Sequence, residues 1–333
     1  MTRLVLNYGG VRYLDRTLAL ETGEISPAGI DLNYIVPASI GDLFRAMAAH
    51  AAFDAAEMSL CTLMVLIGKG DDRLVGIPVF PSRAFRHKQI YVNANSGITE
   101  PRDLAGRLVG VSEYQMTAAL WIRAHLQHDY GVRPEHIRWR TGGLYTPSNV
   151  VRTPIQLPAE VELERIPEGE TLEDMLFDGR IDALVSTEPP HAFTAGKPEV
   201  RRLFPDARRV ELAYFKRTGF FPIMHTVVVR RDIYQANRWI AMSLLNAFNE
   251  AKRVGYERLK YQGAYAVALP WLSSEAEEMD DLFGGDPFPY GFQSNLRILD
   301  AMTAYAHEQG LTPRKLEPRE LFAAEALVDS VPG

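Results

Sequence analysis

The chain of 333 residues is 47% hydrophobic and 23% charged, with a formal net charge of −6. This composition is typical of a globular protein long enough for two domains. The negative charge argues against electrostatic attraction to nucleic acid or to an anionic membrane. The single cysteine, Cys61, excludes an intramolecular disulfide and a thiolate metal cluster. The first residues lack the features of a secretory signal, and no apolar run reaches transmembrane length, so we expect a cytoplasmic protein.

Short apolar strands alternate with helices in the first 80 residues. The pattern predicts strands at residues 4–7, 30–36 and 74–80, a helix at 40–52, and a further apolar helix after Ser59. This alternation is typical of a mainly parallel sheet covered by helices. The turn Tyr8-Gly9-Gly10 follows the first strand, and its glycines allow the backbone to approach a ligand closely.

A second series of strands and helices begins near residue 89. We predict strands at 89–93, 108–111, 136–141 and 181–186, a short helix at 171–177, and a polar, proline-marked surface loop at 149–158. A long amphipathic helix is expected between Ser112 and Tyr130. Ser112 followed by Gln115 is a capping-box pattern, which predicts that this helix begins at Ser112.

The last third returns to the first series. It contains a predicted strand within 220–230, a helix at 235–259, a rigid loop at 284–291 and a helix at 294–310. Because the helix after residue 235 suits the first series, we expect crossovers near Pro81 and Phe220. The predicted fold class is α/β, with two lobes joined by two crossover strands around a central cleft. Residues 1–84 and 221–333 form the first predicted lobe, and residues 85–220 form the second.

Seven stretches, in this order along the chain, resemble the 4,5-dihydroxyphthalate decarboxylase family. They are FDAAEMSL, GIPVFPSRAFRHKQIYVN, VGVSEYQMTAALWIRAHLQHDYGV, WRTGG, GRIDALVSTEPP, FFPIMHTVVVRRDIY and GDPFPYG. The resemblance covers nearly the whole chain and implies the type 2 periplasmic-binding-protein fold. It also implies a carboxy-lyase of phthalate catabolism, which removes one carboxylate from a dihydroxylated phthalate to leave a dihydroxybenzoate.

This reaction requires donors for two carboxylates, a base for a ring hydroxyl and an acid that protonates the ring carbon. Arg83, Arg86 and His87 form a basic cluster near the first expected crossover. A guanidinium binds a carboxylate in bidentate fashion, and in an extended segment Arg83 and His87 would share one face. The alternative is a hinge whose cations face water.

Three residues are candidates for proton transfer. Imidazole titrates near neutral pH, which selects His87 and His225; each could instead be a structural histidine bonded to a backbone carbonyl. Glu57 could accept a proton from a catechol hydroxyl, with helix capping as its alternative role. The predicted catalytic residues are therefore His87, His225 and Glu57.

The predicted substrate-binding residues lie mostly at strand ends, where ligands bind in such sheets. They are Tyr8, Gly9, Ser59, Arg83, Arg86, Glu113, Tyr114, Gln115, Thr117 and Glu188. Glu113 would repel a ligand carboxylate, so we expect it to bind a hydroxyl or a cation, or to satisfy the helix end. For Glu188 the alternative is a salt bridge between the lobes. The helix after Ser112 is expected to orient the ring while the hinge side reacts.

The implied reaction requires no organic cofactor, and we predict none. We also predict no metal site, because the candidate residues lack diagnostic ligand spacing, but binding of a divalent metal ion is not excluded. The expected partner is a small aromatic carboxylate, with no nucleic acid and no membrane; long exposed helices are compatible with a homodimer. Three alternative functions remain on this scaffold: a solute-binding protein, another enzyme such as a chorismate-derived dehydratase, and a non-catalytic sensor of aromatic acids.

Overall fold

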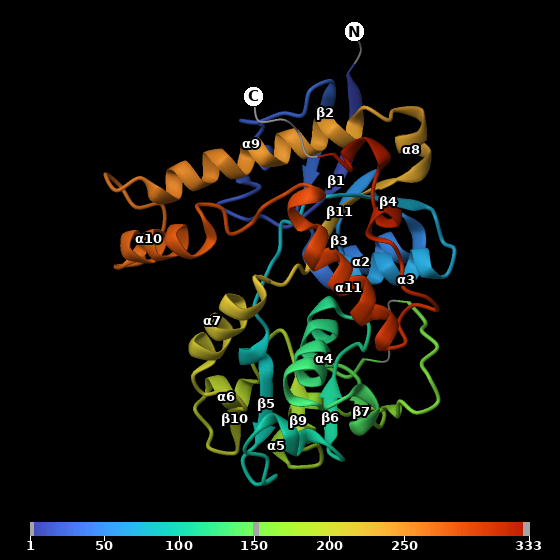
Figure 1. The fold of residues 1–333 in the computed structure, drawn as a ribbon, viewed down its shortest axis with the longest axis vertical. Helices are drawn as coiled ribbons and strands as arrows, with labels where there is room; N and C mark the ends of the chain where they lie inside the picture. The colour runs from blue at the N-terminus through green and yellow to red at the C-terminus, as the bar shows by residue number, and fades with distance from the viewer. Residues whose placement is uncertain (1–2, 149–152, 329–333) are drawn as a thin grey trace. The chain divides into compact units, whose positions relative to one another are not determined.

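The computed structural model describes residues 3–148 and 153–328 (Figure 1). Its contacts divide the chain into two compact units. Unit 1 comprises Met1–Arg83, Ile223–Asp300 and Glu317–Gly333, and unit 2 comprises Ala84–Pro222 and Ala301–Leu316. The predicted first lobe included all of residues 221–333, so the structure differs at Ala301–Leu316. This segment belongs to unit 2 because its Gln309 bonds there, accepting from Arg123 Nε at 2.8 Å.

Unit 1 is built on a five-stranded sheet with the order β2-β1-β3-β11-β4. The strands are β1 (Leu4–Gly9), β2 (Ile30–Ile35), β3 (Ala55–Ser59), β4 (Leu74–Ile77) and β11 (His225–Arg230). The neighbours β2, β1 and β3 run parallel, as predicted, whereas β11 runs antiparallel to both β3 and β4. The register of β11 against β3 sets the distance between the two polar side chains described below.

The helices of unit 1 cap and cover this sheet. They are α1 (Leu18–Glu21), α2 (Ile40–His50), α3 (Leu60–Gly68), α8 (Arg231–Ala236), α9 (Ile240–Lys260) and α10 (Leu272–Phe283), with α11 (Leu296–Glu308) continuing into unit 2. Three 3₁₀ turns lie at Gln293–Asn295, Pro318–Leu321 and Ala324–Ala326. The single helix predicted at 235–259 is divided near Asn237, whose φ of −145° is not helical. The unpredicted α10 folds back beside the end of α9, where Lys260 pairs with Asp280 at 2.7 Å (Figure 1).

Unit 2 has a six-stranded sheet with the order β10-β5-β9-β6-β7-β8. Its strands are β5 (Ile90–Asn93), β6 (Leu108–Val111), β7 (Arg138–Thr141), β8 (Leu163–Arg165), β9 (Ala183–Val185) and β10 (Val200–Arg202). Its helices are α4 (Thr117–Tyr130), α5 (Leu172–Phe177), α6 (His191–Thr194) and α7 (Ala207–Thr218), with 3₁₀ turns at His87–Gln89, Pro101–Leu104 and Pro134–His136. The strands β9, β6, β7 and β8 are parallel, and β5 is antiparallel to both of its neighbours.

The start of α4 differs from its prediction. The helix begins at Thr117 after Met116, which makes no side-chain cap, so the capping box predicted at Ser112 is wrong. The Gln115 amide instead donates to Glu113 Oε2 at 3.2 Å and to the Thr153 carbonyl at 3.3 Å. That amide therefore does not cap the helix. Glu113 precedes the helix and does not lie in its first turn.

The loop predicted at 149–158 lies partly outside the described residues, at positions 149–152. Among the helices that the structure describes, none combines the length and the apolar character needed to cross a membrane.

Candidate functional site

Glu57 and His225 lie on neighbouring strands and touch. Glu57 is the central residue of β3 and is completely buried, opposite Val227 of β11. His225 opens β11 two positions away, and its Nδ1 lies 2.6 Å from Glu57 Oε1. Since a carboxylate only accepts, the Nδ1 proton of His225 points to Glu57 and leaves Nε2 as the reactive nitrogen. The His225 side chain is 17% exposed, whereas Glu57 is completely buried.

Two donors from the β1–α1 loop also bind Glu57. The Tyr13 hydroxyl donates to Oε1 at 2.8 Å, and the Val11 backbone N–H donates to Oε2 at 3.2 Å. Burial, followed by the charge of Glu57, raises the pKa of Tyr13, so its hydroxyl stays protonated and continues to donate. Together with His225, these donors occupy both carboxylate oxygens and fix the orientation of the buried group.

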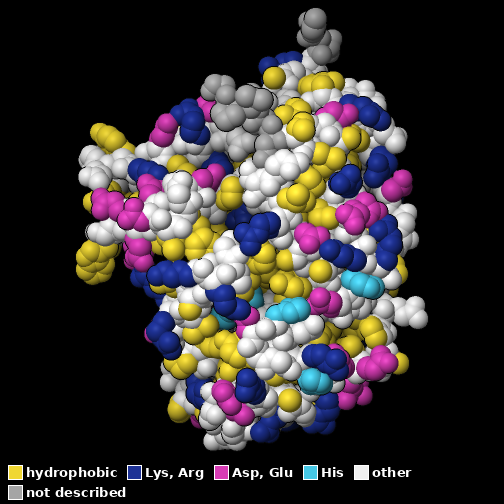
Figure 2. All heavy atoms as spheres, viewed as in Figure 1, with side chains coloured by type: hydrophobic (Ala, Val, Ile, Leu, Met, Phe, Trp, Pro, Cys, Tyr) yellow, Lys and Arg dark blue, Asp and Glu magenta, His cyan; other side chains and the backbone are white. Residues whose placement is uncertain are grey.

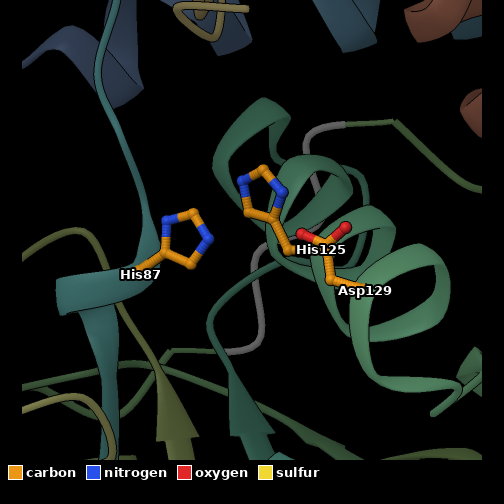
Figure 3. A group of neighbouring side chains, drawn as sticks. All are labelled: His87, His125 and Asp129. Carbon is orange, nitrogen blue, oxygen red and sulfur yellow. The ribbon is translucent and has the colours of Figure 1, made fainter. Parts of the chain in front are cut away.

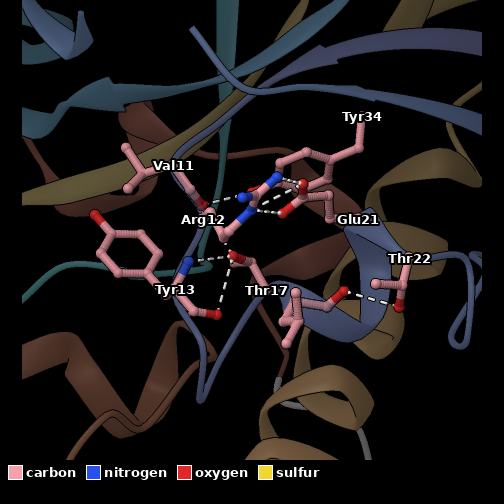
Figure 4. Close-up of polar contacts among 8 residues, drawn as sticks. Val11, Arg12, Tyr13, Thr17, Glu21, Thr22 and Tyr34 are labelled. Atoms are coloured by element: carbon pink, nitrogen blue, oxygen red, sulfur yellow. Dashed lines mark hydrogen bonds and ion pairs between the residues drawn. The ribbon is translucent and has the colours of Figure 1, made fainter. Parts of the chain in front are cut away.

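The loop that carries these donors is held by its own polar network (Figure 4). Thr17 Oγ1 accepts from the Tyr13 N–H and donates to the Val11 carbonyl, both at 2.9 Å. The Tyr34 hydroxyl donates to the same carbonyl at 2.7 Å, while Arg12 pairs with Glu21. Sequence reasoning missed Tyr13 and the Val11 N–H, although they follow the carboxyl end of β1, the position that already selected Tyr8 and Gly9.

The other predicted residues of unit 1 have close structural neighbours. Tyr8 is buried against Tyr34, with ring centroids 4.9 Å apart, and a Cβ on Gly9 would lie 2.6 Å from Leu43 Cδ1. Ser59 accepts the Thr62 N–H at 3.3 Å and so caps α3. The contacts of Tyr8 and Gly9 are therefore packing contacts within unit 1, and Ser59 serves as a helix cap.

Arg83 lies buried at the end of unit 1. Its Nη2 donates to the Pro289 carbonyl at 2.9 Å and to Asn295 Oδ1. Burial lowers the pKa of Arg83 to about 10, which still leaves it charged at neutral pH. These contacts tie Arg83 to the loop before α11.

The hinge-side candidates of unit 2 do not continue an extended segment. His87 begins a 3₁₀ turn at His87–Gln89, so the expectation that Arg83 and His87 share one face of a strand is wrong. Arg86 Nη1 donates to Gln89 Oε1 at 2.6 Å, and Arg86 is buried. The turn closes on itself through this bond.

His87 packs on His125 beside Asp129 (Figure 3). One potential ligand atom from each lies within 4.8 Å of the others, so these are the described residues that could hold a metal ion. The two rings are stacked, however, 4.4 Å apart with planes 16° apart. Lone pairs lie in the ring planes, so the stacked rings do not converge on one ion, and Asp129 already pairs with Arg217 at 2.8 Å.

Neither ring nitrogen of His87 has a hydrogen-bond partner in the part of the chain that the structure describes. Burial, helped by the charge of Arg217, lowers the pKa of His87 to about 4. A histidine with this pKa is neutral at pH 7, which makes His87 a weak candidate for the proton donor.

The predicted residues around α4 lie in different environments. Tyr114 is buried, with the Arg123 guanidinium 3.7 Å from its ring centroid, and Thr117 is the buried first residue of α4. Glu113 and Gln115 bond to each other, and Glu188 is exposed after β9. The structure thus brings together Glu57 and His225 in unit 1, whereas the α4 residues belong to unit 2.

Comparison with known proteins identifies the lineage. No family model matches the chain. A 4,5-dihydroxyphthalate decarboxylase of Comamonas testosteroni is 36% identical over 327 residues, covering 98% of each chain. The chain belongs to the 4,5-dihydroxyphthalate decarboxylase family. A Pseudomonas putida protein of the same name is 34% identical over 220 residues, covering 66% of this chain and 84% of that protein.

Solved structures confirm the fold. The periplasmic aliphatic sulphonate binding protein SsuA from Escherichia coli matches with a TM-score of 0.54 at 15% identity, covering 97% of this chain and 99% of that chain. A mutant of DSZB in complex with biphenyl-2-sulfinic acid matches with a TM-score of 0.53 at 17% identity, covering 98% of both chains. This family member therefore has the predicted α/β fold of the type 2 periplasmic-binding-protein class.

Proposed function

We propose that this chain is a carboxy-lyase that converts 4,5-dihydroxyphthalate, or a closely related hydroxylated phthalate, to a dihydroxybenzoate. The observation that carries the proposal is the 36% identity to a protein of that name over 98% of both chains. A binding protein needs no buried carboxylate that orients a histidine, so the Glu57–His225 pair favours the enzyme over the solute-binding and sensor alternatives.

In the proposed reaction His225 transfers the proton. Its Nε2 removes a proton from the ring hydroxyl para to the leaving carboxylate, which raises electron density on the carbon that bears this group. The same proton is then delivered to that carbon. The bond between ring and carboxylate breaks, its electron pair restores the aromatic ring, and carbon dioxide leaves. The phenolate oxygen that remains takes a proton from water, which gives the dihydroxybenzoate.

Glu57 acts as a positioning residue in this scheme. It holds the Nδ1 proton of His225 and stabilises the imidazolium formed between the two proton transfers. Tyr13 and the Val11 N–H keep the carboxylate in place while the charge moves.

The test is incubation of the purified protein with 4,5-dihydroxyphthalate, with related hydroxyphthalates and with phthalate itself. We expect one carbon dioxide per hydroxylated substrate and none from phthalate, which lacks the hydroxyl. Binding of the whole panel without release of carbon dioxide would establish a binding protein or a sensor instead. A chelator added to the active protein tests the open question of a divalent metal ion.

We further propose that the protein acts in the cytoplasm, in the degradation of phthalates, with a small aromatic carboxylate as its partner. The net charge of −6 argues against a nucleic acid or membrane partner. On the face in Figure 2, Lys and Arg side chains are interspersed with Asp and Glu. Cell fractionation tests the location, and growth on phthalate of a strain lacking the gene tests the role in degradation. Light scattering tests whether the protein forms a homodimer.

A further inference from the structure

Two buried cations of unit 1, Lys252 and Arg83, and the partly buried Arg16 converge on the loop Asp286–Tyr290, which the proposed mechanism leaves unused. Lys252 Nζ lies 2.5 Å from Asp286 Oδ2 and 2.7 Å from the Phe288 carbonyl. Arg83 donates to the Pro289 carbonyl, and the Arg16 guanidinium lies 4.0 Å from the Phe288 ring centroid. Because Arg83 and Lys252 bond to the loop itself, they fix its position, and Arg16 remains as the cation to explain.

Arg16 is clamped between two aromatic rings. Its guanidinium carbon lies 4.5 Å from the Tyr13 ring centroid and 4.0 Å from that of Phe288. Nη1 pairs with Asp15 at 3.2 Å, whereas the buried Nε has no hydrogen-bond partner in the described part of the chain. An unsatisfied buried donor is unfavourable, so a group that accepts from this edge would gain binding free energy by satisfying it.

A second donor lies on the same loop, two positions after Phe288, whose ring packs on Arg16. The Tyr290 hydroxyl is buried and likewise has no hydrogen-bond partner among the described residues. Burial raises the pKa of Tyr290, and the charges of Asp15, Asp286 and Glu57 raise it further against the opposing charge of Arg16, so the hydroxyl stays protonated and can donate. A guanidinium N–H and a tyrosine hydroxyl are both donors that a carboxylate can accept from.

We propose that Arg16 and Tyr290 form the subsite for the carboxylate that remains on the product. The inference rests on the proposed function, and Tyr13 connects the two sites: its ring stacks on Arg16 while its hydroxyl binds Glu57. The retained carboxylate suits a permanent ion pair because its charge does not change. The leaving carboxylate gives up its charge, and an equally strong ion pair would stabilise the ground state and slow the reaction.

The test compares Arg16→Gln with Arg12→Gln. Both changes remove one guanidinium from the same loop, but Arg12 is exposed and pairs with Glu21, so its loss is a matched control. Calorimetric titration with phthalate, 3,4-dihydroxybenzoate and catechol measures binding without turnover. In Arg16→Gln we expect about 10- to 100-fold weaker binding of both carboxylates and unchanged binding of catechol. Tyr290→Phe, which removes only the hydroxyl, should weaken the same two ligands by about threefold to tenfold.

The inference is overturned if Arg16→Gln binds the carboxylates as tightly as Arg12→Gln does, or if catechol binding falls by the same factor. Carbon dioxide release separates this result from the proposed function. A wild-type protein that binds carboxylates through Arg16 but releases no carbon dioxide contradicts the proposed function and leaves the subsite standing. An active enzyme whose kcat/KM is unchanged in Arg16→Gln contradicts the subsite alone.

Discussion

A carboxylate in the middle of a sheet is costly to desolvate unless donors replace the water it loses. Glu57 meets this requirement with His225, Tyr13 and the Val11 N–H. His225 is 168 positions away along the chain and reaches Glu57 only through the antiparallel pairing of β11 with β3. At the scale of single residues, the site therefore depends on which donors face this carboxylate.

Replacing Glu57 with glutamine keeps the shape of the side chain and removes its charge. The amide no longer stabilises the imidazolium or selects the Nδ1 proton, so we expect kcat to fall by about 10²- to 10⁴-fold. Steady-state release of carbon dioxide measures the loss. Glu24→Gln is the control, because Glu24 forms an exposed pair with Arg258; an equal loss in both variants would contradict the role of Glu57.

Tyr13 and Tyr34 offer a comparison of two hydroxyl deletions in one network. Tyr13→Phe removes a donor from a buried carboxylate, and Tyr34→Phe removes a donor from the neutral Val11 carbonyl. We expect a loss of about 1.5–3 kcal/mol of unfolding free energy for the first and about 1 kcal/mol for the second. Urea unfolding with unchanged m-values measures both; a smaller effect for Tyr13 would argue that its bond to Glu57 contributes little.

At the scale of elements, β4 is stabilised by a close backbone approach. A Cβ on Gly76 would lie 2.5 Å from the Leu321 carbonyl oxygen, and Ala323 donates to the Gly76 carbonyl at 2.8 Å. The glycine lets the segment after Pro318–Leu321 lie along the strand.

Gly76→Ala should therefore destabilise the protein by about 1–3 kcal/mol, because the backbone must move to admit the methyl group. Gly41→Ala is the control: the nearest atom to its new Cβ is Ser39 Oγ at 3.6 Å, and it lies within α2. That change should be neutral or stabilise by up to about 1 kcal/mol. Thermal unfolding distinguishes the two, and equal melting temperatures would show that the segment moves freely.

Sequence patterns predicted the elements better than their ends. The apolar spacing of residues 40–52 corresponds to α2, and the strands at 108–111 and 181–186 correspond to β6 and β9. The start of α4 was misplaced because Gln115 bonds to Thr153, a contact that no local pattern shows. Glu57 and His225 could be predicted because their side chains can accept or transfer a proton. Tyr13 and Arg16 are recognised only from their contacts in the folded protein, which the sequence does not show.

At the scale of the whole molecule, the histidines of unit 2 make stability depend on pH. His87 has a pKa of about 4 in the folded protein, lowered by burial, against about 6.5 when unfolded. Burial also lowers the pKa of His125. The unfolded chain therefore binds more protons, and stability is complete above pH 6.5 and lost as the pH falls toward 4.

From His87 alone we expect a loss of about 2 kcal/mol between pH 7 and pH 5. His87→Phe keeps a ring in the stack and removes the titrating group. This variant should therefore lose about 2 kcal/mol less unfolding free energy than the wild type between pH 7 and pH 5. His50→Gln, a change at an exposed histidine, should behave like the wild type. Urea unfolding at both pH values measures the difference, and equal losses in wild type and His87→Phe would refute the assignment.

The tryptophans of the two units differ in their exposure to solvent. The chain has four; Trp121 and Trp139 are fully buried and lie in unit 2, while Trp239 and Trp271 are 45% and 75% exposed and lie in unit 1. Buried indoles emit at shorter wavelengths than hydrated ones, so a red shift on unfolding reports mainly on unit 2. Replacing both exposed tryptophans with phenylalanine would leave an optical probe of that unit alone, with the chemistry at Glu57 and His225 untouched.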